Sequence, residues 1–201
     1  MPKVRKQGST PLLHRLFLLA WLAAQIVVPN AAAQTLLYEK SRVSVVSRQM
    51  NVPVEAPFKK FSAEIHFDPL KPNAGRARID VDVGSFDIGD AEVNDDVKSK
   101  TWFDAKNHPR AVFVTSSVRA LGGVRFEARG PLTIKGKTLE VVAPFTYKDE
   151  AGVAVYEGQF PIKRLQYNIG EGVWKDTDTV ADEVLIRFRL VIAKATAAGN
   201  R

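Results

Sequence analysis

The sequence of 201 residues predicts an all-β protein, in which about eight antiparallel strands form either a closed barrel or a two-sheet sandwich. Three observations predict this class. Apolar and polar side chains alternate with a period of two over most of the chain. Turn signals rich in glycine and proline separate the alternating runs. A single segment near residues 90–105 lacks the alternation, and it indicates a short helix.

The first 33 residues have the features of a secretory signal peptide. Four basic and no acidic side chains precede or enter an apolar stretch of 13 residues, Leu16–Val28, which is followed by Ala31–Ala33. This stretch is shorter than the ~20 residues that a membrane-spanning helix needs. We therefore expect cleavage after Ala33, export to the periplasm, and a mature domain over residues 34–201.

Strands are expected from residue 42 onward. Four runs alternate strictly: Phe61–Asp68, Ala77–Val83, Val124–Arg129 and Val184–Ile192. Four further runs alternate less strictly: 42–48, 109–119, 138–148 and 152–164. Turn signals at residues 68–75, 122–123, 135–136 and 150–152 separate several of these runs. Two of these links are short enough for hairpins, so the strands on either side of them should be antiparallel neighbours.

The segment Asp90–Asp104 is the expected helical element. Asp90 can cap a helix start, and the acidic side chains that follow favour the positive end of the helix dipole. Val93, Val97 and Trp102 could face the protein. His108 and Pro109 then lead the chain into the next strand.

Composition and charge exclude several classes of function. The absence of cysteine excludes disulfides, thiolate metal sites and a cysteine nucleophile. The formal net charge is +7, but residues 1–33 account for +4 of it, and the remaining 25 basic and 22 acidic side chains are interleaved. We therefore do not expect nucleic acid as a partner.

Catalytic constellations are weak. His66 and His108, the histidines of the mature chain, show no metal-ligand spacing. A cluster of acidic residues over 176–183 lacks the glycine and the glutamate spacing of a calcium loop. The sequence therefore predicts neither an enzyme, nor a metal site, nor a cofactor.

A barrel of eight strands is either filled with side chains or holds one small ligand. The apolar faces of the expected strands carry many aromatic residues, and the alternation alone leaves both alternatives open. A third alternative is an enzyme that acts on a lipid in such a cavity, with Tyr147 or Tyr156 as the polar group.

A series of motifs in a fixed order carries a resemblance to a known family. The stretches are Ser47–Glu55, Phe58–Pro69, Val81–Gly89, Lys100–Asp104, Gly130–Gly136, Tyr167–Thr177 and Val180–Val184. Together they resemble the YceI-like family of secreted polyisoprenoid-binding proteins over about residues 37–194. Two positions depart from the family pattern, Ala56 in place of a glycine and Asn94 in place of an aspartate.

The resemblance implies a lipocalin-like antiparallel barrel with a helical segment over an elongated apolar cavity. It implies a non-covalently bound isoprenoid lipid, such as a quinone or its precursor, and no catalytic residues. The stretches 49–55 and 169–177 resemble a branch whose members occur near b-type membrane cytochromes. Such a cytochrome, or the membrane surface, is therefore an expected partner, and a homodimer is one open possibility.

The expected cavity lining follows from strand parity and from this resemblance. Strand parity selects apolar residues that face inward, and family geometry places Trp102 and Phe103 at the cavity mouth. The predicted lining is Phe61, Ile65, Phe67, Ile79, Val81, Trp102, Phe103, Phe113, Phe126, Phe145, Tyr147 and Phe188.

Overall fold

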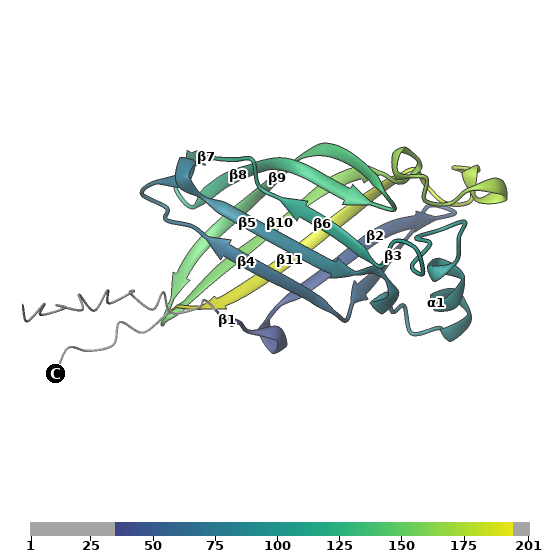
Figure 1. The fold of residues 1–201 in the computed structure, drawn as a ribbon, viewed down its shortest axis with the longest axis horizontal. Helices are drawn as coiled ribbons and strands as arrows, with labels where there is room; N and C mark the ends of the chain where they lie inside the picture. The colour runs from purple at the N-terminus through teal and green to yellow at the C-terminus, as the bar shows by residue number, and fades with distance from the viewer. Residues whose placement is uncertain (1–34, 195–201) are drawn as a thin grey trace, which may run out of the picture. The chain divides into compact units, whose positions relative to one another are not determined.

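The computed structural model describes residues 35–194, and the expected signal peptide lies outside these residues. The described chain forms one curled antiparallel sheet (Figure 1). Its strands are β1 (Thr35–Leu36), β2 (Arg42–Gln49), β3 (Val52–Phe58), β4 (Phe61–His66), β5 (Arg76–Asp82), β6 (Arg110–Val114), β7 (Ser117–Gly122), β8 (Arg125–Ile134), β9 (Lys137–Glu150), β10 (Val153–Lys163) and β11 (Glu183–Ala193). The helical elements are α1 (Ala91–Lys98) and the short 3₁₀ turns η1 (Tyr38–Lys40), η2 (Pro72–Ala74), η3 (Val83–Ser85), η4 (Arg164–Tyr167) and η5 (Gly172–Lys175).

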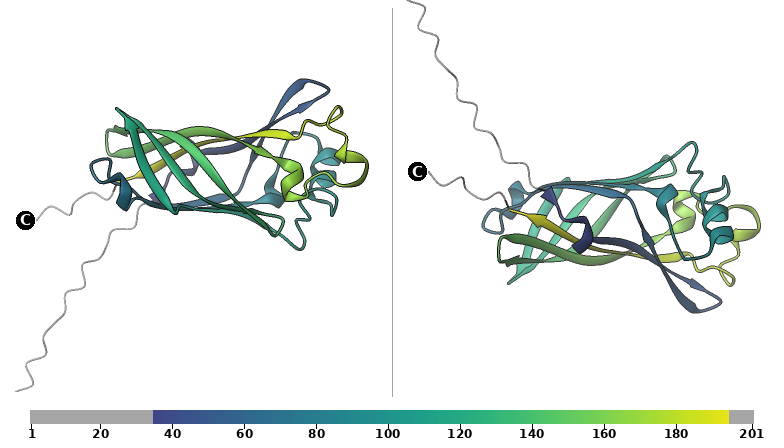
Figure 2. Two further views of the ribbon diagram at one scale, coloured as in Figure 1. Left: turned by 90° about the horizontal axis from the view of Figure 1, so that it is seen from above. Right: turned by 90° about the horizontal axis from the view of Figure 1, so that it is seen from below.

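The strands follow the order β3-β2-β11-β10-β9-β8-β6-β5-β4, with β1 paired to β11 and β7 paired to β8. Every pairing is antiparallel. The prediction of an all-β antiparallel, lipocalin-like barrel with one short helix is confirmed, in the form of a curled half-barrel. The two further views show the strands wrapping around a common interior (Figure 2).

The sheet holds more strands than the eight expected, and β3 is the main addition. Its sequence contains Pro53 and Pro57, which weaken a strand pattern because proline cannot donate a ladder hydrogen bond. β3 lies at one edge of the sheet and pairs with β2 alone. An edge strand tolerates proline because one side of its backbone needs no partner.

The expected run 109–119 is divided into β6 and β7. The division lies where β8 crosses both strands at Gly130. A Cβ atom at Gly130 would lie 2.0 Å from the carbonyl oxygen of Val114 and 3.0 Å from the amide nitrogen of Ser116. Only glycine permits this close approach, so one strand can exchange its pairing from β6 to β7 at that point.

The helix α1 starts as the sequence predicts. The Asp90 carboxylate accepts hydrogen bonds from the amides of Glu92 and Val93, at 2.9 and 3.2 Å. α1 ends at Lys98, and residues 99–108 continue as turns. Figure 1 shows α1 at the same end of the sheet as the β2–β3 hairpin; we call this the helical end. β1 and the β9–β10 turn lie at the opposite end, the terminal end.

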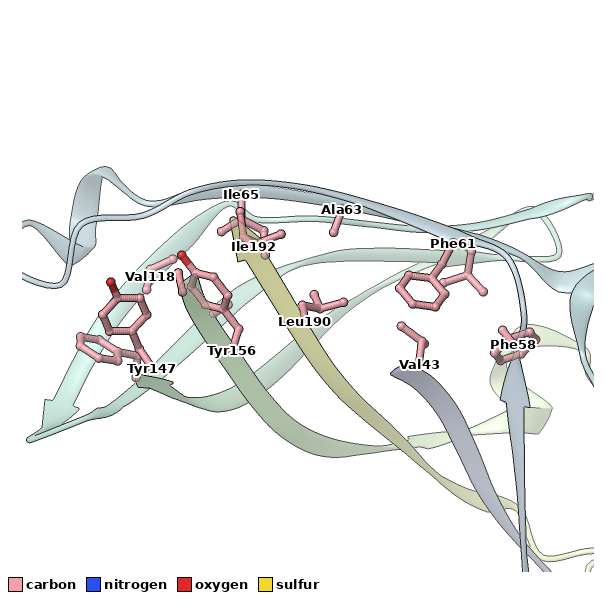
Figure 3. Close-up of a cluster of buried hydrophobic side chains, with 14 of the residues drawn as sticks. Val43, Phe58, Phe61, Ala63, Ile65, Val118, Tyr147, Tyr156, Leu190 and Ile192 are labelled. Atoms are coloured by element: carbon pink, nitrogen blue, oxygen red, sulfur yellow. The ribbon is translucent and has the colours of Figure 1, made fainter. Parts of the chain in front are cut away.

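The inward faces of the strands form the core. The alternation is clearest in β4, where Phe61, Ala63 and Ile65 are buried and their neighbours are exposed. Figure 3 shows these side chains facing Val43 and Leu190 across the interior. No helix within residues 35–194 has both the length and the apolar content required to cross a bilayer.

A seam separates the two ends of the strand order. Within the described residues no ladder joins β3 to β4, although only Lys59 and Lys60 connect them. The Tyr38 ring packs on the Phe61 ring at a centroid distance of 5.3 Å, and the Tyr38 hydroxyl donates to the Phe61 carbonyl oxygen. An isolated bridge between Phe58 and Phe86 adds a second contact. Side-chain contacts and isolated hydrogen bonds therefore close the sheet along this seam, in place of a continuous ladder.

Glu55 connects β3 to β2 and, beyond it, to β11. Its carboxylate accepts from the Ser44 hydroxyl at 2.7 Å and from Arg187 Nη1 at 3.1 Å, and Arg42 Nη2 lies 3.7 Å away. The Ser44 hydrogen bond is the main cause that lowers the pKa of Glu55 below its ordinary value of 4.5, and Arg42 and Arg187 lower it further.

We expect Glu55→Gln to destabilise the protein by about 0.5 kcal/mol at neutral pH, since the carboxylate is partly exposed and solvent screens its ion pairs. A lowered pKa stabilises the fold fully above pH 4.5, and this contribution disappears as pH falls through the folded-state pKa. Urea unfolding of both proteins between pH 3 and 7 tests this. A difference between wild type and variant that persists at the acid end contradicts the assignment.

Candidate functional site

A cavity of about 410 Å³ lies inside the curled sheet, between the strands and α1. Nearly all of its lining side chains are apolar. Nine of the twelve predicted residues line it: Ile65, Phe67, Ile79, Val81, Trp102, Phe103, Phe113, Phe145 and Phe188. Strand parity brings these residues together because alternate positions of each strand point to the same face of the sheet.

The interior is hollow. Ile79, Phe113, Ile186 and Phe188 point inward, yet each remains partly accessible and none reaches the burial of a packed core residue. In a filled barrel these positions would contact neighbours on every side. The structure therefore contains a cavity on the inner face of the sheet, and side chains do not fill the interior along its whole length.

Three predicted lining residues lie outside the lining. Phe61 packs against Tyr38 at the seam. Phe126 and Tyr147 are 3% and 9% exposed and belong to the packed core at the terminal end. Strand parity correctly places all three on the inner face. Strand parity does not reveal the position of a residue along the barrel axis. These three residues lie where other side chains fill the interior.

An aromatic cluster closes the cavity toward the terminal end. The Phe67 ring lies 5.0 Å from Phe126, 5.6 Å from Phe145, 5.3 Å from Tyr147 and 6.0 Å from Tyr156. These contacts are edge-to-face, the arrangement that aromatic quadrupoles favour. Phe145 and Tyr156 line the cavity. Phe126 and Tyr147 lie outside the lining and pack against the rings that form it.

A second aromatic group lies at the helical end. The centroid of the Trp102 ring, in the turns after α1, lies 5.4 Å from the centroid of the Trp174 ring in η5. Both rings line the cavity. Phe103 lies 6.0 Å from Phe58 and 6.5 Å from Phe86. These contacts attach the segment after α1 to the strands and to the η5 loop.

The cavity opens at the helical end. Four of its exposed lining residues lie on α1, the β2–β3 hairpin and the loop before β11: Gln49, Met50, Asp96 and Thr179. Met50 is the most exposed of them, at 77%. Its φ of +46° places a methionine in the left-handed region, which usually favours glycine or asparagine. An apolar side chain is thus held at the rim of the opening.

Arg164 is a site residue that the sequence interpretation missed. It is 2% exposed and lines the cavity at the start of η4. All five of its N–H groups donate to backbone carbonyl oxygens of η5 and of the two loops that flank it. The acceptors are Ala181 (3.1 Å from Nε), Ile169 and Gly170 (2.9 and 3.4 Å from Nη1), and Trp174 and Val180 (2.7 and 2.6 Å from Nη2).

Burial lowers the pKa of Arg164, and the negative charge of Asp182 partly offsets this effect. The guanidinium carbon lies 5.8 Å from the centre of the Trp102 ring. Gly170 is required here, because a Cβ atom on it would lie 2.1 Å from Arg164 Nη1. Arg164 therefore fixes the loops at the cavity opening, and it has no N–H group left for a ligand.

Polar groups at the cavity wall are few. The Thr115 hydroxyl is buried without a hydrogen-bond partner, and Tyr156 places a phenol among the aromatic rings. Within residues 35–194, no group of three His, Asp or Glu side chains is arranged to hold a metal ion. The arrangement can enclose an apolar molecule, and it offers a hydroxyl for a hydrogen bond.

Comparisons with known proteins agree with this geometry. The family model of the YceI-like domain matches residues 35–192. The crystal structure of Burkholderia cenocepacia BcnA is similar, with a TM-score of 0.77 and 49% identity, over 81% of this chain and all of BcnA. A polyisoprenoid binding domain from Saccharophagus degradans shares the fold, with a TM-score of 0.66 and 15% identity, over 81% of this chain and 99% of that domain.

A curated relative, the UPF0312 protein of Azotobacter vinelandii, is 28% identical over 133 residues, which are 63% of this chain and 67% of that protein. The chain spans about half the length of the Pseudomonas UPF0312 proteins that it also matches.

Proposed function

This chain belongs to the YceI-like family, and from that premise we propose that it binds a long-chain polyisoprenoid in the cavity and carries or stores it in the periplasm. The observation that carries the proposal is the hollow apolar interior of about 410 Å³. The polyisoprenoid binding domain from Saccharophagus degradans shares this fold and supports the same ligand class.

The physical driving force is the removal of the isoprenoid chain from water. Burial of apolar surface contributes about 25 cal/mol per Å², so a chain that buries several hundred Å² gains on the order of 10 kcal/mol before ordering costs. The lining offers apolar contacts along the whole interior, from Trp102 at the helical end to Phe145 near the terminal end. A hydrocarbon chain needs no charged anchor for such binding.

Binding without catalysis is part of the proposal. Arg164 donates every N–H group to the backbone, and within residues 35–194 no base bonds to the Tyr156 phenol, which lies among aromatic rings. Export through a cleaved signal peptide, a membrane b-type cytochrome or the membrane surface as partner, and the oligomeric state remain predictions from the sequence.

Solvent extraction of the protein purified from its native compartment, followed by mass spectrometry, tests the proposed function. We expect an isoprenoid lipid at about one molecule per chain. The denatured and refolded protein should take the same lipid up again from a micellar suspension. A protein that carries no isoprenoid and takes none up when it is offered would contradict the proposal.

A further inference from the structure

The strands β9 and β10 separate toward the helical end. Their ladder begins at the β9–β10 turn and ends at the pair Phe145 and Gly158. In the same register residues 140–144 would pair with residues 159–163, but within the described chain no ladder joins these segments. On their other sides, β9 remains paired with β8 and β10 remains paired with β11. Two strand edges without a ladder partner therefore border one opening, which we call the β9–β10 fork.

Glycine and proline residues produce this fork. A Cβ atom on Gly158 would lie 2.3 Å from the carbonyl oxygen of Pro144, so only glycine permits the close approach where the strands begin to diverge. Beyond that point, Pro144 and Pro161 lack the N–H group that a continued ladder would need. The sequence therefore favours separation of the two edges.

A second cavity of about 410 Å³ lies in the fork. Its walls are residues 139–142 of β9 and residues 161–163 of β10, together with Gln166, Tyr167 and Glu183. Among the described residues, Ile162 is the one member of this lining that also lines the cavity inside the sheet. An occupant of the fork therefore contacts a different set of side chains from a molecule in the interior.

Tyr167 contributes an unpartnered hydrogen-bond donor to the fork. Its side chain is 1% exposed and packs in the apolar cluster that includes Ile162, and within residues 35–194 its hydroxyl has no hydrogen-bond partner. Burial raises the pKa of Tyr167 to about 12, so the phenol is protonated and can donate at neutral pH. A buried hydroxyl without a partner costs free energy, and an acceptor oxygen supplied by an occupant would remove this cost.

The open edges define the class of occupant. Residues 159–163 span ~17 Å of extended chain, and a strand edge presents amide and carbonyl groups at alternating positions along its length. Another extended backbone complements such a row throughout, as when a peptide strand adds to an exposed sheet edge. Apolar side chains of the added strand can pack against Val141 and Ile162, which line the fork.

The rim of the fork carries a small excess of negative charge. Glu140, Lys163 and Glu183 are exposed lining residues, and none of the three forms an ion pair within residues 35–194. Two carboxylates and one ammonium group therefore favour an occupant that brings a basic side chain to the rim.

We propose that the β9–β10 fork binds a short extended segment of another protein, which enters as an added β-strand. The backbone of this segment pairs with the open edges, and one of its carbonyl oxygens accepts from the Tyr167 hydroxyl. A basic side chain of the segment lies beside Glu140 or Glu183. This site goes beyond the proposed lipid binding, and neither depends on the other.

Fluorescence anisotropy and hydrogen exchange measured by NMR test this proposal on the purified protein. The probe is a labelled heptapeptide in which valine alternates with lysine. A second peptide replaces the lysines by glutamates, and a third carries an N-methyl group on every second amide. We expect the lysine peptide to bind and to slow amide exchange within residues 140–143 and 162–163 by about tenfold. The other two peptides should bind about fivefold more weakly or not at all.

Two variants test the side chains of the fork. Tyr167→Phe should weaken binding of the lysine peptide by about threefold to tenfold, and Glu140→Gln by about twofold. Glu150→Gln is the matched control, because Glu150 is exposed on the same strand at the terminal end, and it should bind the peptide as the wild type does. In thermal unfolding, Tyr167→Phe should keep the wild-type stability, since it removes only an unpartnered hydroxyl.

Three results overturn the proposal: no binding of the lysine peptide, equal binding of the N-methylated peptide, or binding that leaves the amides of the fork unprotected. Unchanged binding by Tyr167→Phe overturns the role of its hydroxyl. Uptake of isoprenoid by the same preparation is measured separately, so a failure of the fork is distinct from a failure of the proposed function.

Discussion

Ala143→Phe is expected to weaken isoprenoid binding at least tenfold while the protein remains folded. Ala143 lies on β9, is 5% exposed and lines the cavity, opposite Ala128 of β8. A phenyl ring at this position projects into the hollow interior and occupies space that the lipid would fill. Substitutions that fill a cavity commonly keep or raise stability, so we expect the free energy of unfolding to change by less than about 1 kcal/mol.

The measurements are the lipid that copurifies with each variant and the uptake of added isoprenoid by the delipidated protein. Val142→Phe is the matched control, since Val142 is the neighbouring residue, points outward and is 37% exposed. This control should bind lipid as the wild type does. Full lipid occupancy in Ala143→Phe would mean that the ligand lies elsewhere.

Arg164→Met is expected to destabilise the protein by about 4 kcal/mol. The substitution removes five hydrogen bonds and leaves the carbonyl oxygens of the two loops without donors. A buried polar group that loses its hydrogen-bond partner typically costs about 1–3 kcal/mol, and several carbonyl oxygens lose theirs here. The loops can recover part of this by exposing the carbonyl groups to water, which would open the cavity at its helical end.

Urea unfolding and the rate of lipid release measure the two effects. Arg164→Lys keeps the charge but offers three donors in place of five, so its loss of stability should be intermediate. Lys163→Met is the control, because Lys163 is the preceding residue and is exposed. An Arg164→Met protein within about 1 kcal/mol of the wild type would show that the guanidinium does not hold these loops.

Local periodicity was sufficient to predict most of the strands. β4 alternates without a break, so its inward residues could be assigned from the sequence alone. In β11 the alternation holds from Ile186 to Leu190 and ends where Leu190, Val191 and Ile192 are all buried. β3 was not predicted because Pro53 and Pro57 resemble a loop signal. A strand accepts these prolines only because it lies at the edge of the sheet. That position depends on tertiary pairing, which periodicity does not contain.

The sequence predicted which face of each strand points to the interior. It did not predict where along the barrel the interior is hollow. Phe126 and Phe145 pair directly across β8 and β9, and both point inward. Phe145 lines the cavity, whereas Phe126 packs within the aromatic cluster outside the lining. This difference depends on where neighbouring rings close the interior. Arg164 left no signal at all, because an arginine at the end of an alternating run usually lies in solvent. Its burial depends on carbonyl groups 5 to 17 residues further along the chain, in irregular segments whose path the periodicity does not predict.

Because of the seam between β3 and β4, the curled sheet does not resist strand separation equally at every boundary between strands. Separating β2 from β11, or β8 from β9, breaks a ladder of backbone hydrogen bonds. At the seam, separation breaks the Tyr38 bond to Phe61, the bridge between Phe58 and Phe86 and the ion pair between Lys59 and Asp87. We therefore expect the sheet to open along this seam before it opens along the long ladders of β8–β9 and β10–β11.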